Sequence, residues 1–397
     1  MKILLIYDGE YPWDIRIEKM CKSLVKKKHK VTLCCRNLKG SANQEIGPEG
    51  QIILRTPKIF PKKNMKFGEI LSFPLFINPI WFYTIIKGIR FASPDVIIVR
   101  DLPLTLCAFY ASKFFKKIII MDMAEVYPEG LKSNWGYDKM RFIDYFLRNP
   151  SLAELLEKTC IRKVQRIIVV SPESKQRLIK KACDPKSLFI VSNTPEMDKF
   201  HPIPASFPGV MSNMQGSFII LFCGIFVGDR GLKIAIKAMP QILQHVSAKL
   251  ILIGDGPAYD SLKFLIASLN LENQVVFTGW IDNIDLPEYI ASADLGILPF
   301  MNCSHIRITI ANKIFDYMAM NKAFLASDVP PMRRIVEETG AGILFQPENI
   351  EDFSSKVIRL ASDSAMRQEL GQKGLEAVRT KYNWLYDEKK LFQAINW

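Results

Sequence analysis

An acidic residue stands one turn into a predicted helix, where its chemistry would suit a sugar. The segment Asn312–Met320 carries apolar residues at the spacing of one helical face, namely Ile314, Phe315, Met318 and Ala319. Asp316 falls on a different face of the same helix. A charged carboxylate makes stronger hydrogen bonds than a neutral acceptor, and its two oxygens suit the two hydroxyls of a diol. The pattern predicts a diol-binding acid, with a solvent-exposed helix acid as the alternative.

A site for an anion is predicted where a strand, a glycine-containing loop and a helix follow one another. Ser217–Phe222 is predicted to be a strand, and a helix is predicted to start at Leu232. Free N–H groups and the positive end of the helix dipole converge at a helix start and attract anions. Arg230 lies just before this start, and its guanidinium matches the fork geometry of a phosphate. We therefore expect a phosphate group at this loop.

Alternating strands and helices are expected to position these residues. Lys2–Tyr7, Ile15–Lys28 and Val31–Cys35 read as strand, helix and strand, which implies a parallel sheet. The loop after the first strand has no Gly-x-Gly-x-x-Gly, which disfavours dinucleotide binding in this half. Ser192–Gly216 is rich in Pro, Ser, Asn and Met and is predicted to link two domains. The alternation then resumes as far as Leu360, so the expected fold class is α/β with two doubly wound domains.

The segment from Asn312 to Ala323, NKIFDYMAMNKA, resembles the NK-x-x-E-Y-M-A-x-G-K-P motif of family 4 glycosyltransferases. These enzymes have the two-domain GT-B fold, retain anomeric configuration and need no bound metal. The resemblance implies that Asp316 holds the ribose of a nucleotide sugar and that Lys313 lies near its phosphates. The chain departs from the family in two ways: the acid is Asp where Glu is usual, and Ile308 stands where many members have a second acid.

The loop Gly224–Gly231 is similar to the family's G-R-L-x-x-x-K-G loop, whose two basic residues neutralise the donor diphosphate. Arg230 takes the position of the lysine, whereas Ile225 takes that of the arginine. The resemblance implies that Arg230, Lys313 and Asp316 are the catalytic residues. The donor-binding residues that it implies are Gly224, Gly228, Gly231, Gly279, Trp280, Ile281, Thr309 and Asn312.

The first half of the chain carries weaker matches to the same family. Asp14 and Arg16 belong to a P-x-D-x-R-x-x-K pattern after the first strand. Asp122 and Glu125 belong to a loop that resembles D-x-H-E-x-Y-P-E, with Ala124 in place of the histidine. With Asp101, which follows a strand, the residues expected to face the cleft or the acceptor are Asp14, Arg16, Asp101, Asp122 and Glu125. The expected domains are residues 1–200, with a final helix in 381–397 crossing back onto them, and residues 201–380.

Charge and aromatic residues point to a membrane surface. Residues 1–200 hold 35 Lys and Arg against 20 Asp and Glu, a surplus of 15, whereas residues 201–397 hold 18 against 20. Within residues 57–92, basic residues flank an apolar aromatic run that is too short, and too rich in proline, to span a bilayer. The run is predicted to lie in the interface of an anionic membrane. The alternative is a helix that packs its aromatics into the core; a nucleic-acid binder is disfavoured because aromatics and basic residues do not alternate on strands.

Cysteine usage and the N-terminus indicate the compartment. The eight cysteines form no C-x-x-C pair and no zinc spacing with the four histidines, which is typical of a reducing compartment. The N-terminal apolar run reaches Asp8 too soon for a signal peptide. We expect a cytoplasmic protein, peripheral on the inner face of the plasma membrane.

The sequence therefore predicts a retaining, metal-independent glycosyltransferase of the type that builds envelope or capsular polysaccharide. It would move a hexosyl or N-acetylhexosaminyl group from a UDP- or GDP-sugar to a glycan or lipid-linked acceptor, with no cofactor. One alternative is a sugar-nucleotide 2-epimerase on the same fold. The other is a non-catalytic binder of sugar nucleotides or membranes, which Ala124, Ile225 and Ile308 favour.

Overall fold

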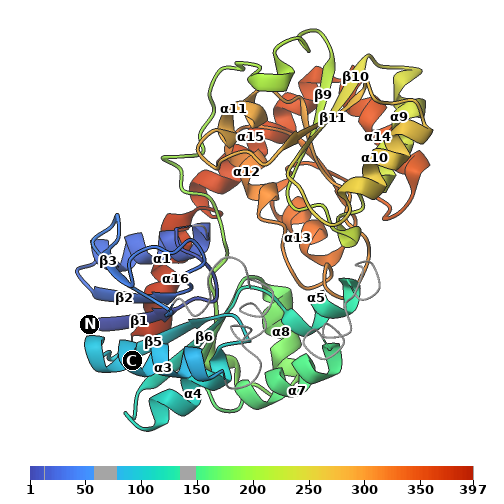
Figure 1. Ribbon diagram of the computed structural model, residues 1–397. Coiled ribbons are helices and arrows are strands. Elements are labelled where there is room, and N and C mark those ends of the chain that lie inside the picture. The colour runs from blue at the N-terminus through green and yellow to red at the C-terminus, as the bar shows by residue number, and fades with distance from the viewer. Residues whose placement is uncertain (13, 58–77, 135–148, 397) are drawn as a thin grey trace. The chain divides into compact units, whose positions relative to one another are not determined.

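The computed structural model describes residues 1–12, 14–57, 78–134 and 149–396. These residues form two compact units (Figure 1). Unit 1 contains residues 1–132, 149–192 and 388–396, and unit 2 contains residues 133–134 and 193–387. Each unit is a mainly parallel sheet with helices on both faces, so the predicted doubly wound α/β class is confirmed.

Unit 1 is built on a sheet of eight strands in the order β3-β4-β2-β1-β5-β6-β7-β8. Among the strands in the described residues, only β3 runs antiparallel to its neighbour. The strands are β1 (Lys2–Ile6), β2 (Lys30–Cys35), β3 (Gln44–Ile46), β4 (Ile52–Arg55), β5 (Val96–Arg100), β6 (Ile118–Met123), β7 (Arg166–Val169) and β8 (Leu188–Ile190). The central strands are almost continuous runs of buried apolar residues, because helices cover both faces of a parallel sheet.

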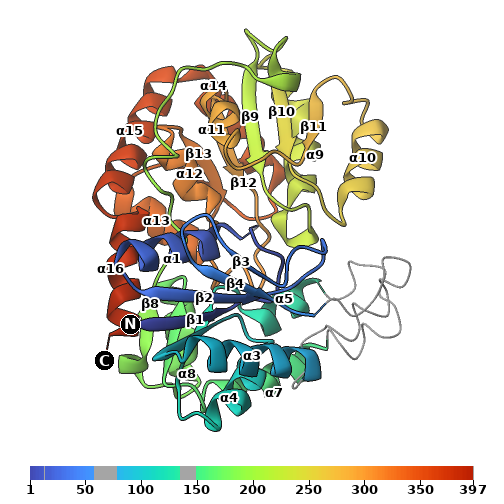
Figure 2. The same ribbon diagram turned by 60° about the vertical axis from the view of Figure 1, so that its left-hand side comes forward.

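Four of the described helices of unit 1 start at a side-chain cap. The described helices are α1 (Ile15–Lys26), α3 (Pro79–Ala92), α4 (Thr105–Lys113), α5 (Tyr127–Asn134), α7 (Pro150–Cys160) and α8 (Pro172–Lys180). Asp14, Asn78, Asn149 and Ser171 cap α1, α3, α7 and α8 by accepting hydrogen bonds from first-turn N–H groups. In Figure 2, α1 lies on one face of the sheet, and α3 and α4 lie on the other.

Helix α3 tests part of the prediction that the aromatic run lies in a membrane interface. Residues 58–77 of that run lie outside the described residues. In α3, Trp81, Ile85 and Ile89 are fully buried against the sheet, so this side of the helix belongs to the core. No helix in the described ranges has the length and apolarity needed to cross a bilayer.

Unit 2 is built on six parallel strands in the order β11-β10-β9-β12-β13-β14. The strands are β9 (Phe218–Cys223), β10 (Ala248–Ile253), β11 (Val275–Gly279), β12 (Leu295–Leu298), β13 (Phe324–Ser327) and β14 (Ile343–Phe345). The helices are α9 (Leu232–Leu243), α10 (Tyr259–Ser268), α11 (Leu286–Ala291), α12 (Lys313–Ala319), α13 (Pro330–Thr339), α14 (Ile350–Ser362) and α15 (Ser364–Thr380). Helices α9, α10 and α14 lie on one side of the sheet, and α11, α12 and α15 lie on the other (Figure 1).

The final helix, α16 (Trp384–Ile395), contributes to both units. Its first residues belong to unit 2, where the N–H of Trp384 donates to the carbonyl of Pro195 at 2.9 Å. Its last residues belong to unit 1, where Arg166 donates to the carbonyl of Ala394 at 2.8 Å.

Each sheet has one point where the strand order reverses, and this point predicts where ligands bind. In unit 1 the reversal lies between β1 and β5, and in unit 2 it lies between β9 and β12. The connections on the two sides of such a point leave in opposite directions and open a crevice at the carboxyl ends of the strands.

Candidate functional site

The crevice of unit 2 is formed by the loops that follow β9 and β12. Gly231 is the residue that lets them meet. Its φ is +64°, and a Cβ atom at this position would lie 1.9 Å from the carbonyl oxygen of Pro299. Only glycine tolerates both the left-handed backbone and this close approach. The loop that carries Arg230 is therefore held directly against the segment after β12.

Arg230 rests on an aromatic ring that this approach brings to it. Its guanidinium carbon lies 4.8 Å from the centroid of the Phe300 ring. The side chain of Arg230 is 22% exposed, so the guanidinium can still be reached by a ligand. It stands just before the first turn of α9, whose cap residue Gly231 offers no side chain to the free N–H groups. A cation beside the free N–H groups of a helix start is an arrangement that attracts anions.

A buried acid–histidine pair contacts Arg230 through the acid. Asp229 is 3% exposed, and its Oδ2 lies 3.0 Å from Nδ1 of His305. Burial would raise the pKa of Asp229, but the hydrogen bond to His305 and the charge of Arg230 hold it below its usual value. The N–H of Met301 also donates to the carbonyl of Asp229 at 2.9 Å. Sequence reasoning missed both residues; its only hint was an acid next to Arg230 between two glycines.

Asp316 is not the solvent-exposed helix acid of the alternative interpretation. It is 8% exposed, and its Oδ2 accepts a hydrogen bond from Nζ of Lys313 at 2.8 Å. Burial would lower the pKa of Lys313, but the Asp316 carboxylate raises it above its ordinary value, so the lysine stays charged. The next residue, Tyr317, donates its hydroxyl to the carbonyl of Leu221 in β9 at 3.1 Å. This contact holds α12 beside β9.

The remaining residues predicted to bind the donor lie on neighbouring loops of the same sheet edge. Gly224 and Gly228 belong to the loop after β9, and Trp280 and Ile281 follow β11, whose last residue is Gly279. Trp280 is 56% exposed. Thr309 donates its hydroxyl to the carbonyl of His305 at 2.9 Å, and Asn312 directly precedes α12. Ile225, at the position of the missing arginine, is 46% exposed.

In unit 1, two of the predicted residues bind each other. Arg16 and Asp122 are 1% and 0% exposed, and NH2 of Arg16 lies 2.6 Å from Oδ1 of Asp122. Arg16 also donates to the carbonyl of Val191 at 2.9 Å. Such complete burial prevents either side chain from contacting an acceptor. We assign them the role of joining α1, β6 and the end of β8.

Three other predicted residues gather at the reversal point between β1 and β5. Asp101 has a left-handed backbone, with φ of +65°, and its Oδ1 accepts from the N–H groups of Ala124 and Glu125, each at 3.1 Å. Arg100 lies 2.8 Å from Asp101 and 3.3 Å from Asp14. Burial, reinforced by the charges of Glu125 and Asp122, raises the pKa of Asp101 to about 7 despite Arg100. A carboxyl group that titrates near neutrality therefore lies at this edge.

The raised pKa of Asp101 predicts a loss of stability at high pH. The folded protein keeps a proton that the unfolded chain releases at its ordinary value of 3.8. This contribution is complete below pH 3.8, declines as pH rises, and is gone above about 7. Asp101→Asn keeps the neutral form at all pH values. We therefore expect the difference in free energy of unfolding between Asp101→Asn and wild type to grow by about 1–2 kcal/mol from about pH 5 to pH 8. This is less than the pKa shift alone would give, because the side chain is partly exposed and water screens its charge.

Chemical denaturation of both proteins across that pH range would measure the difference. Asp260→Asn, which changes an exposed acid in the first turn of α10, serves as the control and should show no such trend. A difference between Asp101→Asn and wild type that does not change with pH would contradict the assignment.

Two family models match the two halves of the chain. The model described as Glycosyltransferase Family 4 matches residues 15–195, and the one described as Glycosyl transferases group 1 matches residues 211–377. An uncharacterized glycosyltransferase from Methanocaldococcus jannaschii is 28% identical over 166 residues. That match covers 42% of this chain and 41% of the relative, so the matched part spans about two fifths of its length.

Solved structures resemble the whole chain. Sucrose-phosphate synthase from Thermosynechococcus elongatus has a TM-score of 0.78 at 16% identity, covering 98% of this chain and 97% of that one. The Anabaena protein HepE, solved with UDP-glucose, has a TM-score of 0.76 at 13% identity, covering 100% and 99%. At these identities the likeness supports the fold alone, and it confirms the predicted GT-B architecture of the two sheets.

Proposed function

Because the chain belongs to the group 1 and family 4 glycosyltransferases, we propose that it transfers a sugar from a nucleotide sugar to an acceptor hydroxyl with retention of configuration. The observation that carries this proposal is that Arg230 lies in the loop after β9, while α12, which carries the Lys313–Asp316 pair, is bonded to β9 through Tyr317. A nucleoside diphosphate needs both a cation for its phosphates and an acceptor for its ribose hydroxyls, and this edge offers both.

The chemistry assigned to these groups is electrostatic. The bond between the anomeric carbon and the diphosphate oxygen breaks, and a bond from that carbon to the acceptor oxygen forms. Arg230, the first turn of α9 and Lys313 stabilise the negative charge that develops on the diphosphate. The acceptor proton passes to the departing phosphate oxygen. Asp316 accepts the ribose hydroxyls and thereby holds the nucleotide while the bond breaks.

A uridine nucleotide is the preferred donor of this proposal. The HepE structure contains UDP-glucose in a fold that superimposes on this chain, and family membership makes a comparable donor reasonable here. Trp280, exposed after β11, would face the base. Among UDP-, GDP- and ADP-sugars, we expect only a UDP-sugar to raise the melting temperature, because a ligand that binds the folded state alone stabilises it by about 2.7 kcal/mol at a hundred times its Kd.

A thermal-shift panel of the three nucleotide sugars would check this expectation, followed by an assay of donor consumption with and without acceptor glycans. Stabilisation by none of the three would contradict nucleotide-sugar binding. Conversion of the bound donor to its 2-epimer in the absence of any acceptor would show that the protein is an epimerase and not a transferase.

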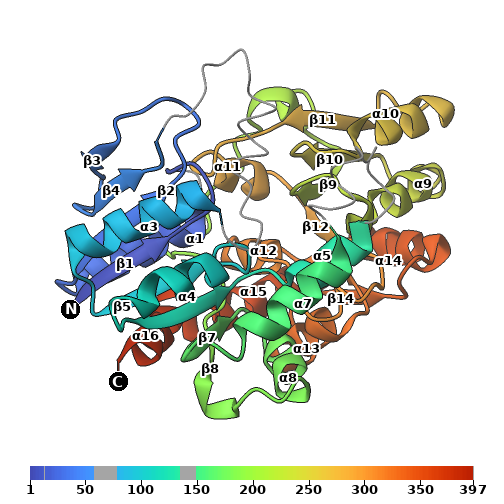
Figure 3. The same ribbon diagram turned by 60° about the horizontal axis from the view of Figure 1, so that its bottom comes forward.

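The outer side of α3 and α4 supports a membrane-bound acceptor. Helix α3 carries three exposed residues spaced four apart, namely Tyr83, Lys87 and Phe91. The end of α4 carries three more, namely Tyr110, Lys113 and Phe114. We call these six residues the α3–α4 surface. The two helices lie side by side in Figure 3. Residues 79–92 and 105–117 contain no Asp or Glu. Exposed aromatics among basic residues suit the headgroup region of an anionic bilayer, where a lipid-linked or envelope glycan would be extended.

We expect Lys87→Gln/Lys113→Gln to weaken binding to phosphatidylglycerol-containing vesicles by about 10- to 30-fold, because each basic residue near an anionic surface contributes about 1 kcal/mol. Tyr83→Ser/Phe114→Ser should also weaken it. Vesicle co-sedimentation measures both effects. Phe264→Ser is the matched control, since Phe264 on α10 is 77% exposed, as is Phe114. Equal binding to neutral phosphatidylcholine vesicles would refute electrostatic docking.

A further inference from the structure

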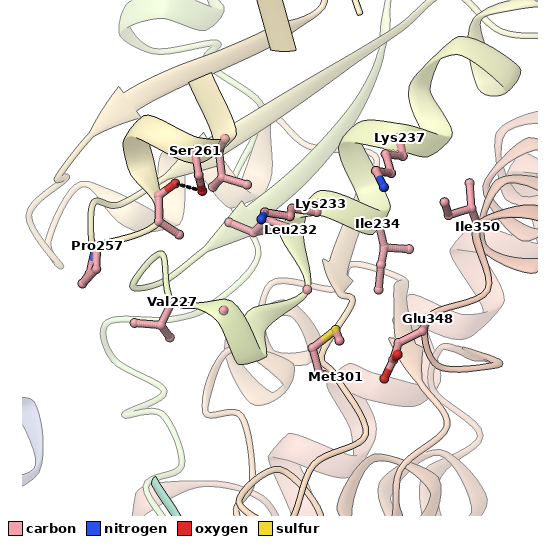
Figure 4. A pocket seen from close by; sticks show the side chains of 14 residues that line it. Val227, Leu232, Lys233, Ile234, Lys237, Pro257, Ser261, Met301, Glu348 and Ile350 are labelled. Atoms are coloured by element: carbon pink, nitrogen blue, oxygen red, sulfur yellow. Dashed lines mark hydrogen bonds between the residues drawn. The ribbon is translucent and has the colours of Figure 1, made fainter. Parts of the chain in front are cut away.

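A separate pocket of about 440 Å³ lies on the flank of unit 2 (Figure 4). Its walls are the loop Val227–Gly231, the first turns of α9, the start of α10, Met301, and the residues that lead into α14. Its volume falls within the range of about 300–1,000 Å³ that is typical of small-molecule sites. Lys313, Asp316 and Trp280 do not line it, so it is distinct from the proposed ribose and base sites.

The pocket combines apolar walls with three charged side chains. Ile234, Met301 and Ile350 provide apolar contact. Lys233 and Lys237 are one turn apart on the exposed side of α9, and Glu348 lines the pocket beside Met301 (Figure 4). Within the part of the chain that the structure describes, none of these three has an ion-pair or hydrogen-bond partner. Glu348 is held in place because Asn349, the next residue, caps α14 by accepting from the N–H of Asp352 at 2.9 Å.

We propose that this pocket binds a small phosphorylated polyol, such as a sugar phosphate. The ammonium groups of the two lysines supply positive charge and N–H donors for a phosphate. The Glu348 carboxylate only accepts hydrogen bonds, so it selects hydroxyl groups on the same ligand and repels a second anion. The C–H faces of a sugar ring would pack on Ile234 and Ile350.

The ligand of this pocket also acts on the diphosphate site, a step that rests on the proposed function. The two sites share the loop Val227–Gly231, which carries Arg230. They also share the segment Phe300–Met301: Phe300 lies under the Arg230 guanidinium, and Met301 lines the pocket and donates to Asp229. A ligand that contacts Met301 and the loop therefore changes how firmly Arg230 is held. The two ligands then alter each other's affinity by one common factor.

Calorimetric titration with glucose 6-phosphate, without nucleotide, tests the pocket. We expect binding that is at least about tenfold tighter than that of glucose or inorganic phosphate, and that weakens at least about tenfold in Lys233→Gln/Lys237→Gln. Glu348→Gln should weaken glucose 6-phosphate but not phosphate. Lys26→Gln/Lys30→Gln removes the same charge from exposed lysines of unit 1 and should bind as wild type does.

Asp316→Ala should keep this binding, because Asp316 does not line the pocket. Loss of glucose 6-phosphate binding in Asp316→Ala, or its retention in Lys233→Gln/Lys237→Gln, would overturn the pocket assignment. The coupling is tested separately, by titrating UDP with and without saturating glucose 6-phosphate. A change of about threefold or more in the Kd of UDP is expected, and an unchanged Kd would overturn the coupling. Failure of UDP to bind at all would count against the proposed function and leave the pocket test intact.

Discussion

Asp316→Ala is expected to weaken UDP-sugar binding by about 10- to 100-fold, since hydrogen bonds to a charged acceptor contribute about 1.5–3 kcal/mol. The ribose hydroxyls lose their acceptor. Lys313, which now pairs with Asp316 at 2.8 Å, loses the partner that raises its pKa. Titration of UDP and UDP-sugar into both proteins measures the change. The ratio should be similar for the two ligands, because the lost contact is with the nucleotide.

Two variants separate this effect from a general loss of structure. Asp316→Asn keeps an acceptor oxygen without the charge and should fall between wild type and Asp316→Ala. Asp260→Ala removes another helix first-turn acid, in α10, and should leave UDP affinity unchanged. Wild-type affinity in an Asp316→Ala protein that unfolds cooperatively would contradict the ribose assignment.

Arg230→Ala is expected to lower kcat by about 10²- to 10³-fold, the usual cost of removing one donor that stabilises developing charge. Charge accumulates on the diphosphate as the bond breaks, so KM should change less than kcat. The aromatic support from Phe300 and the Asp229–His305 pair hold Arg230 in place before substrate binds. Steady-state kinetics of donor consumption measures this split.

Arg230→Lys should recover part of the lost rate, because it restores a cation without the planar fork. Arg379→Ala, which removes an exposed arginine of α15, is the matched control and should leave kcat unchanged. An Arg230→Ala enzyme with normal kcat and a raised KM would show that Arg230 binds the donor equally in the ground and transition states, contrary to the assigned role.

Local patterns in the sequence were sufficient for most of the fold. Apolar runs of strand length and amphipathic helices are decided within a few residues, and the structure has the corresponding elements. The short β3–β4 hairpin was not predicted, because Gln44–Ile46 is a polar edge strand without alternation. The aromatic run around Trp81 could not be divided into core and surface residues, because a membrane-interface segment and a helix packed into the core fit the same sequence.

The sequence identified some of the candidate functional residues, but not which of them lie together. Asp316 and Arg230 could be chosen from the sequence because each stands at a helix start with a chemistry that fits a nucleotide sugar. That both lie near the end of β9 depends on the strand order of the sheet, in which β12 is the neighbour of β9. In the sequence, 71 residues separate Cys223 from Leu295, and β10 and β11 come between them. Asp229–His305 and Arg16–Asp122 pair across 76 and 106 residues, and nothing local in the chain specifies such partners.

What the sequence determined by itself is therefore the type of each element and the chemistry of its end residues, because propensity, periodicity and capping act over one or two turns. What only the tertiary structure decided is which of those ends meet, which acids are buried, and which lysines line a pocket. These properties follow from packing between segments far apart in the chain. Arg16 and Asp122 illustrate the difference: by their residue types they suited a ligand site, and by their burial they support the fold.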